Sequence, residues 1–349
     1  MKQSDLIRRA LFLYYTVIPF RFSMVKHQVL SRAASLVKKT QGMRIVDLAI
    51  SYDCNLACAH CSASRLKQNK PLLDLDDYRD VVAQAERMDN LSFNITGGEP
   101  LLSPILDALI TLLKPEKHYI SIQTNGMLLS RSRAEHLAGL GVNCITTSLD
   151  SPYRVCHNRF RGSSRSFDAV FESIAHARSA GMQVLVGTTV THGNLRSAEL
   201  KDLIRLVNKA GAICLFNLAV PCGNWTDNNA IVLRESDRAY LIELMDEFPA
   251  TSTDHEPGRN GKGCPAAMEK IYITPYGDVF PCPFIHVSFG NVRERQLKDM
   301  VSDMRNVPCL QGYPGICVAA EDTVFHRQIL LKSQGRDAGE HPLDYRDVF

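Results

Sequence analysis

Three cysteines lie close together in the stretch ISYDCNLACAHCSAS, residues 50–64, which we call the cysteine loop. They are Cys54, Cys58 and Cys61, in the spacing C-x3-C-x2-C. Clustered thiols are typical metal ligands, but tetrahedral zinc sites are usually closed by four protein ligands and cubane iron-sulfur clusters by four thiolates. The pattern therefore indicates a metal centre with one coordination position that the local sequence does not fill.

Two other interpretations of these cysteines were weighed. A zinc site with His60 as fourth ligand is geometrically poor, because His60 and Cys61 are adjacent and project in different directions. Three core cysteines without metal are the second alternative. We favour iron-sulfur chemistry because of the family resemblance described below, for which the cysteines lie in the expected place after a predicted strand.

Composition sets the class of protein. The chain has 349 residues, of which 45% are hydrophobic and 22% charged, which is typical of a globular protein with one large domain and a smaller one. Eleven cysteines without a secretory signal argue against a secreted disulfide scaffold and for reduced thiols. We therefore expect a cytoplasmic protein.

The N-terminal segment is strongly basic. Residues 1–44 have a net charge of +8, whereas the rest of the chain has a net charge of −5. The apolar run ALFLYYTVIPF, residues 10–20, is too short to span a bilayer. A helix here would either lie on an anionic membrane surface, at the cytoplasmic face, or cap the main domain with its apolar side, and we favour the cap.

Short β-rich runs alternate with helix-length segments after residue 44. The predicted strands are residues 45–51, 91–96, 119–124, 143–149, 183–190 and 213–220, and the clearest helices are residues 75–87 and 166–180. Six such units predict a parallel sheet, in which ligands lie beyond the carboxyl ends of the strands. The cysteine loop follows the first strand. The turn-rich residues 250–263 mark the predicted domain boundary.

The cysteine loop in this context resembles the signature of the radical S-adenosylmethionine (SAM) enzymes. In that family three thiolates hold three irons of a 4Fe-4S cluster, and the fourth iron binds the amino and carboxylate groups of SAM. The resemblance implies that Cys54, Cys58 and Cys61 hold such a cluster. It also implies that reductive cleavage of SAM gives a 5'-deoxyadenosyl radical, which abstracts hydrogen from an unactivated C–H bond.

The second predicted strand ends in ITGGEP, residues 95–100, which resembles the second motif of that family. The resemblance implies that the backbone at Gly97, Gly98, Glu99 and Pro100 receives the amino group of SAM. Glycines suit this role, because a chain without Cβ atoms can approach a ligand closely. The alternative is an ordinary Gly-Gly turn between strand and loop.

Polar residues after the third and fourth strands extend the resemblance. Related enzymes hold the SAM carboxylate with a serine and an arginine, here Ser148 and Arg161, and a guanidinium offers a planar fork of donors for it. Asn125 and Asp150 are implied contacts to the ribose. Each of the four has an alternative as a loop cap or a surface charge.

The C-terminal third contains a second group of cysteines. Cys264 and Cys282 flank a predicted hairpin, with strands at residues 270–274 and from 279 onward, and a hairpin returns Cys282 toward Cys264. Cys309 and Cys317 follow, and four thiols can complete a cubane. A structural zinc suits four cysteines equally well. The remaining Cys144, Cys156, Cys214 and Cys222 show no ligand spacing.

This tail resembles the auxiliary-cluster extension of radical SAM enzymes, with the G-x4-C motif at Gly277 and Cys282. The larger version, called SPASM, has seven cysteines and usually two clusters, whereas the shorter twitch version has one. The four cysteines here resemble the twitch version, so that Cys264, Cys282, Cys309 and Cys317 are the implied ligands of a second 4Fe-4S cluster.

The sequence thus predicts an α/β protein built on a partial (β/α)6 TIM-like barrel. The predicted parts are an N-terminal helical segment (1–43), the radical SAM barrel (44–249) and a small C-terminal cluster-binding domain (250–349). We expect net oxidation of a small polar biosynthetic intermediate, with a flavodoxin- or ferredoxin-like electron donor and no nucleic-acid partner.

Two other functions were considered. A peptide-modifying radical SAM enzyme would often carry an N-terminal leader-recognition domain with its own sheet, for which 44 mostly helical residues are too few. A non-enzymatic iron-sulfur or zinc-binding protein would not need the GGEP motif in its barrel context.

Overall fold

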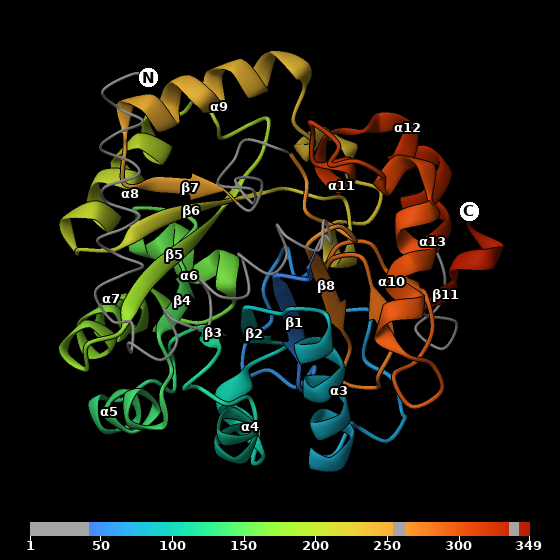
Figure 1. Cartoon of the computed structure of the whole chain (residues 1–349). Helices are drawn as coiled ribbons and strands as arrows, with labels where there is room; N and C mark the ends of the chain where they lie inside the picture. The colour runs from blue at the N-terminus through green and yellow to red at the C-terminus, as the bar shows by residue number, and fades with distance from the viewer. Residues whose placement is uncertain (1–41, 254–262, 335–341) are drawn as a thin grey trace.

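The computed structural model describes residues 42–253, 263–334 and 342–349 (Figure 1). The predicted N-terminal helix, with its basic and apolar residues, falls in residues 1–41 and lies outside the described part. Within the described ranges, no helix combines the length and the apolar character that crossing a membrane requires.

A nine-stranded sheet forms the centre of the molecule, in the order β7-β6-β5-β4-β3-β2-β1-β8-β9. Its strands are β1 Ile45–Ala49, β2 Ser92–Thr96, β3 Tyr119–Gln123, β4 Cys144–Ser148, β5 Gln183–Val190, β6 Ile213–Leu218, β7 Thr251–Thr253, β8 Lys270–Ile273 and β9 Val279–Phe280. All neighbours are parallel except β8 and β9, which are antiparallel. The six predicted strands and the partial barrel are confirmed.

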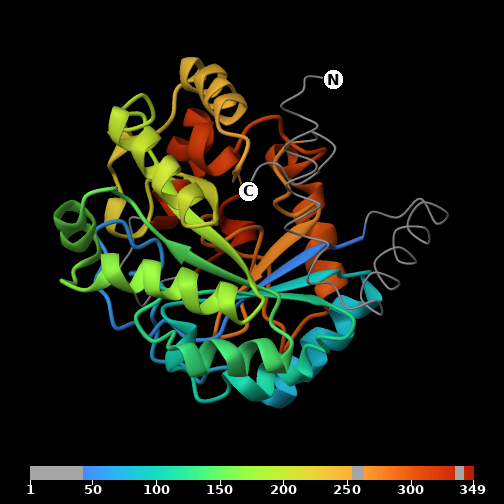
Figure 2. The same ribbon diagram turned by 90° about the vertical axis from the view of Figure 1, so that its left-hand side faces the viewer.

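Helices cover the outer face of this curved sheet, as Figures 1 and 2 show. They are α3 Leu75–Arg87, α4 Leu106–Leu112, α5 Arg131–Leu140, α6 Arg154–Arg161, α7 Ser166–Ser179, α8 Ala198–Lys209 and α9 Glu235–Glu247, followed in the tail by α10 Leu297–Asn306, α11 Val318–Glu321, α12 Thr323–Phe325 and α13 Leu331–Gln334. The predicted helices 75–87 and 166–180 are confirmed to within one residue.

Side chains alternate along the strands because successive residues of a strand point to opposite faces. Val46, Leu48 and Phe93 on the outer face are fully buried in the main core under the helices. The inner face is polar: Asn94 Nδ2 donates to Asp47 Oδ1 (3.1 Å), and Ser121 Oγ donates to Asn94 Oδ1 (2.8 Å). Lys270 Nζ from β8 pairs with Asp47 Oδ2 at 3.1 Å. The strands therefore enclose a hydrogen-bonded lumen rather than an apolar core.

The tail begins with the predicted hairpin, which is confirmed as the antiparallel pair β8 and β9. Strand β8 also pairs in parallel with β1, so the central sheet continues past the predicted boundary near residue 250. A small sheet of β10 (Val287–Ser288) and β11 (Leu343–Asp344) completes the tail. The boundary between a barrel domain and a C-terminal domain at residue 250 stays a prediction, because one sheet contains strands from both sides of it.

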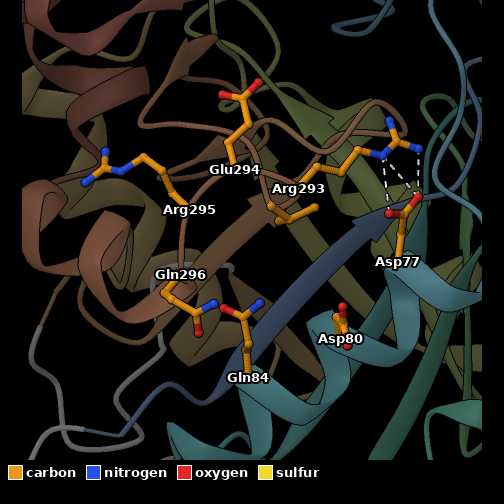
Figure 3. Close-up of a pocket in the computed structure, with 8 residues that line it drawn as sticks. Asp77, Asp80, Gln84, Arg293, Glu294, Arg295 and Gln296 are labelled. Carbon is orange, nitrogen blue, oxygen red and sulfur yellow. Dashed lines mark hydrogen bonds and ion pairs between the residues drawn. The ribbon is translucent and has the colours of Figure 1, made fainter.

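A polar pocket of about 270 Å³ lies where the tail meets α3 (Figure 3). Its side chains make contacts between α3 and the tail: Arg293 pairs with Asp77 at 2.7 Å, and Gln84 Oε1 accepts the backbone N–H of Leu297 at 2.7 Å. These contacts fasten the tail to the barrel. None of the predicted site residues lines this pocket.

Candidate active site

The cysteine loop leaves β1 at the carboxyl end of the sheet. Cys54 is exposed, and Cys58 and Cys61 are half-buried. Burial raises the pKa of the Cys54 thiol, and the negative charge of nearby Glu99 adds to the shift. The thiols of all three cysteines interact electrostatically with one another. The structure therefore brings the predicted cluster ligands together in one loop.

The GGEP turn packs directly on the start of this loop. The Gly98 N–H donates to Ser51 O (2.7 Å) and the Glu99 N–H to Asp53 O (2.8 Å). A Cβ atom on Gly97 would lie 2.1 Å from Ser51 O, and one on Gly98 would lie 2.2 Å from Asp53 O. The two glycines thus allow the motif to approach the cysteine loop closely at Ser51 and Asp53, just before Cys54.

Glu99 links the turn after β2 to the turn after β3 through its buried carboxylate, which is 1% exposed. Oε1 accepts from Thr124 Oγ1 (2.8 Å) and Leu101 N–H (3.0 Å), and Oε2 accepts from Asn125 N–H (2.7 Å). Burial raises the pKa of Glu99, and these hydrogen bonds oppose the rise. Both oxygens are used by the protein, so Glu99 positions the turn of β3 against the turn of β2. Pro100 is buried and begins the short 3-10 turn after β2.

Asn125, predicted as a cofactor contact, lies beside the first cysteine. Its Nδ2 donates to Asn55 Oδ1 (2.7 Å) and lies 3.8 Å from Cys54 Sγ. An amide N–H directed at the sulfur favours the thiolate form, which is the form that binds metal. This contact brings the end of β3 to the cysteine loop.

Arg161 and Asp150 form a buried pair beside the second cysteine. Arg161 Nε and Nη2 lie 2.7 and 2.6 Å from Asp150 Oδ2, and Nη1 lies 3.8 Å from Cys58 Sγ. Burial tends to raise the pKa of Asp150, but its attraction to Arg161 outweighs this and lowers the pKa. The guanidinium is therefore paired with a carboxylate and lies next to the Cys58 sulfur.

Ser148, at the end of β4, differs from these residues. Its side chain is half-buried, and we find no hydrogen bond to its hydroxyl among the described residues. It is paired in register with Gly187 of β5, whose missing side chain leaves room for the Asn217 amide, 2.8 Å from where a Cβ would be. Ser148 thus stays available for a ligand at this end of the sheet.

A second loop, residues 219–225 after β6, closes over the cysteine loop, and we call it the β6 loop. The Asn224 N–H donates to Cys61 O (3.0 Å), and Asn224 Nδ2 donates to Cys58 O (2.8 Å). Gly223 has φ +58°, and a Cβ there would lie 2.0 Å from Cys61 O. No sequence motif indicated this loop, because its contacts join residues more than 160 positions apart.

His60 is held in an aromatic stack rather than beside the cysteine sulfurs as a fourth zinc ligand. Its ring stacks on Phe160 with centroids 4.6 Å apart and lies 5.6 Å from the Trp225 ring. Burial lowers the pKa of His60 to about 4. The side chain is therefore neutral at pH 7 and packs the base of the cysteine loop.

Three of the four tail cysteines come together. The Cys264 N–H donates to Pro314 O (2.8 Å), which places Cys264 beside the segment that leads to Cys317. The Cys317 thiol interacts electrostatically with Cys264 and Cys282, and Cys282 with Cys264. Cys309 is half-buried, and the charged neighbour that affects its thiol is Asp322. The structure thus assembles Cys264, Cys282 and Cys317, with Cys309 apart.

These donor sets fit iron-sulfur clusters. Within the described ranges, no three His, Cys, Asp or Glu side chains are arranged as ligands of a single metal ion. A cubane does not require this, because each thiolate binds its own iron. Both groups consist of thiols, and Asn125 and Arg161 direct N–H groups at sulfurs of the first group. The cysteine loop would hold the SAM cluster, and the tail an auxiliary cluster.

Comparison with known protein families identifies the class of protein to which this chain belongs. The radical SAM superfamily model matches residues 48–207, and the model of the iron-sulfur cluster-binding domain SPASM matches residues 264–315. The chain belongs to the radical SAM superfamily and carries a SPASM domain. It is a radical SAM enzyme. Its cofactors are SAM, the 4Fe-4S cluster that binds SAM, and auxiliary iron-sulfur clustering in the SPASM domain of the tail.

Two curated relatives and one solved structure align with most of this chain. The AdoMet-dependent heme synthase of Nitratidesulfovibrio vulgaris is 24% identical over 313 residues, which cover 80% of this chain and 84% of the relative. The mycofactocin maturase MftC of Mycobacterium tuberculosis is 29% identical over 262 residues, which cover 70% of this chain and 66% of the relative. The crystal structure of Streptococcus suis SuiB bound to its precursor peptide SuiA has a similar fold, with a TM-score of 0.62 and 17% identity over 80% of this chain and 72% of SuiB.

Proposed function

We propose that this enzyme cleaves SAM reductively at a cluster held by Cys54, Cys58 and Cys61, and that it oxidises a small polar biosynthetic intermediate. When bound, the cofactors supply the electron and the 5'-deoxyadenosyl radical that abstracts hydrogen from an unactivated C–H bond. The observation that carries the proposal is that Asn125, which Glu99 positions, lies at the Cys54 sulfur and Arg161 lies at the Cys58 sulfur.

The ends of strands β2 and β4 each supply groups that bind SAM in this proposal. The backbone of Gly97 and Gly98 offers carbonyl oxygens to the amino group of SAM, since the Gly98 and Glu99 N–H groups are already bonded to the cysteine loop. Ser148 offers a hydroxyl to the SAM carboxylate, and Asp150 keeps Arg161 oriented toward Cys58. The positive guanidinium would attract both the carboxylate and the thiolates.

The tail supplies the second redox site. The thiols of Cys264, Cys282 and Cys317 interact with one another, and a cluster held by them would accept the electron that remains on the substrate after hydrogen abstraction. Net oxidation of the substrate follows from this arrangement. A small substrate agrees with the 24% identical relative named as a heme synthase, an enzyme whose product is a small molecule.

Modification of a ribosomally made peptide is the alternative substrate class. SuiB, which shares the fold, was crystallised with its precursor peptide, but a likeness at 17% identity concerns the fold alone. Transfer of deuterium into 5'-deoxyadenosine from a labelled small molecule, or from a labelled peptide, would distinguish the two classes.

We also propose two partners. The SAM cluster needs an electron from a flavodoxin- or ferredoxin-like donor. The basic N-terminal segment, residues 1–41, would bind an anionic membrane surface at low ionic strength, because each Lys or Arg near such a surface adds about 1 kcal/mol of attraction. Co-sedimentation with anionic liposomes, with and without residues 1–40, tests this second partner.

The central experiment compares iron content and SAM cleavage. Anaerobically reconstituted enzyme should hold about eight irons per chain, and replacing Cys54, Cys58 and Cys61 together by alanine should remove about half of them. The same replacement should abolish formation of 5'-deoxyadenosine under reducing conditions. A wild-type iron content near four, with zinc in the tail, would refute the auxiliary cluster, and absence of SAM cleavage would refute the enzyme.

A further inference from the structure

Cys222 is a buried thiol that the proposed function leaves unused. It lies in the β6 loop, outside the residues matched by either family model, and is 2% exposed. We find no hydrogen bond to its sulfur among the described residues. The other cysteines outside the two ligand groups differ. Cys156 is exposed on α6, the Cys214 thiol lies 3.5 Å from Thr188 Oγ1, and the Cys144 thiol lies 3.6 Å from Ile145 O.

The position of Cys222 is fixed by the backbone on both sides of it. Its own N–H donates to Val220 O (2.8 Å), and its carbonyl accepts from the Trp225 N–H (3.0 Å). The next two residues, Gly223 and Asn224, pack against and bond to the Cys61 carbonyl. The Cys222 thiol is thus attached to a segment that the cysteine loop holds in place.

Cys222 lies between the two groups of cysteines. Burial raises the pKa of its thiol, and electrostatic interactions with Cys282 first and Cys61 second raise it further. Cys222 belongs to the main core, and the half-buried Cys282 packs against that core. The buried sulfur of Cys222 in the β6 loop therefore interacts with Cys282 of the tail.

The tail group lacks a fourth sulfur of its own. Cys264, Cys282 and Cys317 interact with one another, whereas Cys309 sits in the separate 3-10 turn Pro308–Leu310. A cubane without an external ligand needs four thiolates. Among the cysteines outside the three, Cys222 is the one that is buried, has no hydrogen bond to its sulfur within the described ranges, and interacts electrostatically with a member of the group.

We propose that Cys222 supplies the fourth thiolate of the auxiliary cluster, together with Cys264, Cys282 and Cys317. The inference rests on the proposed function, because it requires a 4Fe-4S cluster in the tail. It assigns the ligand set across two parts of the chain, one thiolate from the barrel and three from the tail. A cluster closed in this way has no iron open to substrate and serves in electron transfer alone.

This assignment has a consequence for how the two centres communicate. The β6 loop would bind the auxiliary cluster through Cys222 and the cysteine loop through Asn224, whose two N–H groups bond to Cys61 O and Cys58 O. One segment of seven residues, 219–225, would then join the ligand loops of both clusters.

The test uses full-length protein in which Cys54, Cys58 and Cys61 are alanine, so that the tail holds the only cluster. This parent is reconstituted with ⁵⁷Fe and compared by iron content and Mössbauer spectroscopy with further variants Cys222→Ala, Cys222→Ser, Cys309→Ala and Cys214→Ala. The parent should hold about four irons of one class, and Cys309→Ala and Cys214→Ala should match it. Cys222→Ala should make about one iron in four spectroscopically distinct or lose it.

Each result decides the assignment. A change in Cys309→Ala with an unchanged Cys222→Ala overturns it in favour of Cys309, and a distinct iron already present in the parent overturns it in favour of an open position. A parent with no iron in the tail refutes the auxiliary cluster itself and this assignment with it, whereas the proposed SAM cleavage at Cys54, Cys58 and Cys61 is tested separately in the wild type. If both Cys222 variants fail to fold, the Cys309→Ala spectrum still decides, because a single class of iron there leaves Cys222 as the fourth thiolate and a distinct iron overturns the proposal.

Discussion

Gly98 shows how one residue sets the position of the cysteine loop. A Cβ atom there would lie 2.2 Å from Asp53 O and 2.6 Å from Asp53 C, and both are backbone atoms that cannot rotate away. We expect Gly98→Ala to lower the free energy of unfolding by about 1–3 kcal/mol. It should also remove the SAM cluster preferentially, which iron content and SAM cleavage would measure.

The matched control is Gly139→Ala in α5, where an added Cβ meets no atom within 4 Å. This change should raise stability by up to about 1 kcal/mol, because alanine favours the helix. If Gly98→Ala keeps both its iron and its stability, the close approach of the two loops is not required.

His157 gives the site a defined response to acid. Burial lowers its pKa to about 4, and its neutral Nδ1 accepts the Asp150 N–H at 3.2 Å. The folded protein thus binds this proton more weakly than the unfolded chain, whose histidine pKa is about 6.5. The stabilisation is complete above pH 6.5 and is lost as the pH falls toward 4, by an amount of about 3 kcal/mol.

Denaturant unfolding of wild type and His157→Gln across this pH range tests the response. The free energy of unfolding of the wild type should fall more steeply between pH 6.5 and 4 than that of the variant. Parallel curves for the two proteins would show that another group carries the acid sensitivity.

The residues of the site were predictable where a local spacing carried the signal. The spacing of Cys54, Cys58 and Cys61 and the GGEP turn indicated the cluster loop and its neighbour. The sequence could not show that the Glu99 carboxylate accepts hydrogen bonds from the turn after β3, or that Asn224 and Trp225 pack on the cysteine loop. Those contacts depend on which strand ends meet, and no local pattern contains that information.

At the scale of elements, strands and helices followed from hydrophobic periodicity, whereas pairing between distant strands did not. The hairpin β8–β9 was visible in the sequence through its turn residues. Its parallel pairing with β1 was not, because 220 residues separate the two strands and any exposed strand edge would offer the same backbone groups.

The start of α3 illustrates what a single cap contributes. Asp74 accepts hydrogen bonds from the Asp76 and Asp77 N–H groups, and the Asp77 side chain bonds back to the Asp74 N–H. The same Asp77 pairs with Arg293 of the tail. This helix end therefore supports both the barrel wall and the attachment of the tail.

We expect Asp74→Ala to lower the free energy of unfolding by about 0.5–2 kcal/mol, because two N–H groups of the first turn lose their acceptor. Asp80→Ala, at an exposed position of the same helix, is the control and should change stability by less than about 0.5 kcal/mol. Thermal unfolding of both variants measures the difference, and equal effects would mean that the cap is dispensable.

At the scale of the whole molecule, the barrel and the tail share one sheet. Ile271, Tyr272 and Ile273 of β8 are at most 3% exposed, and Met300 and Val301 of α10 are at most 1% exposed. Burying each such side chain contributes about 1.5–3 kcal/mol. Five of them together rival the whole stability of a typical domain, roughly 5–15 kcal/mol.

A chain that ends at residue 249 should therefore fail to fold, although it contains all residues of the radical SAM match. It would expose the edge of β1 and the face of α3 that the tail covers, and unpaired strand edges promote aggregation. A chain that ends at residue 334 keeps β8 and α10 and should stay monodisperse, with cooperative unfolding. Size-exclusion chromatography and circular dichroism compare the two. A soluble, cooperatively unfolding chain of residues 1–249 would show that the barrel is stable without the tail, and that β8 pairs with a sheet already complete.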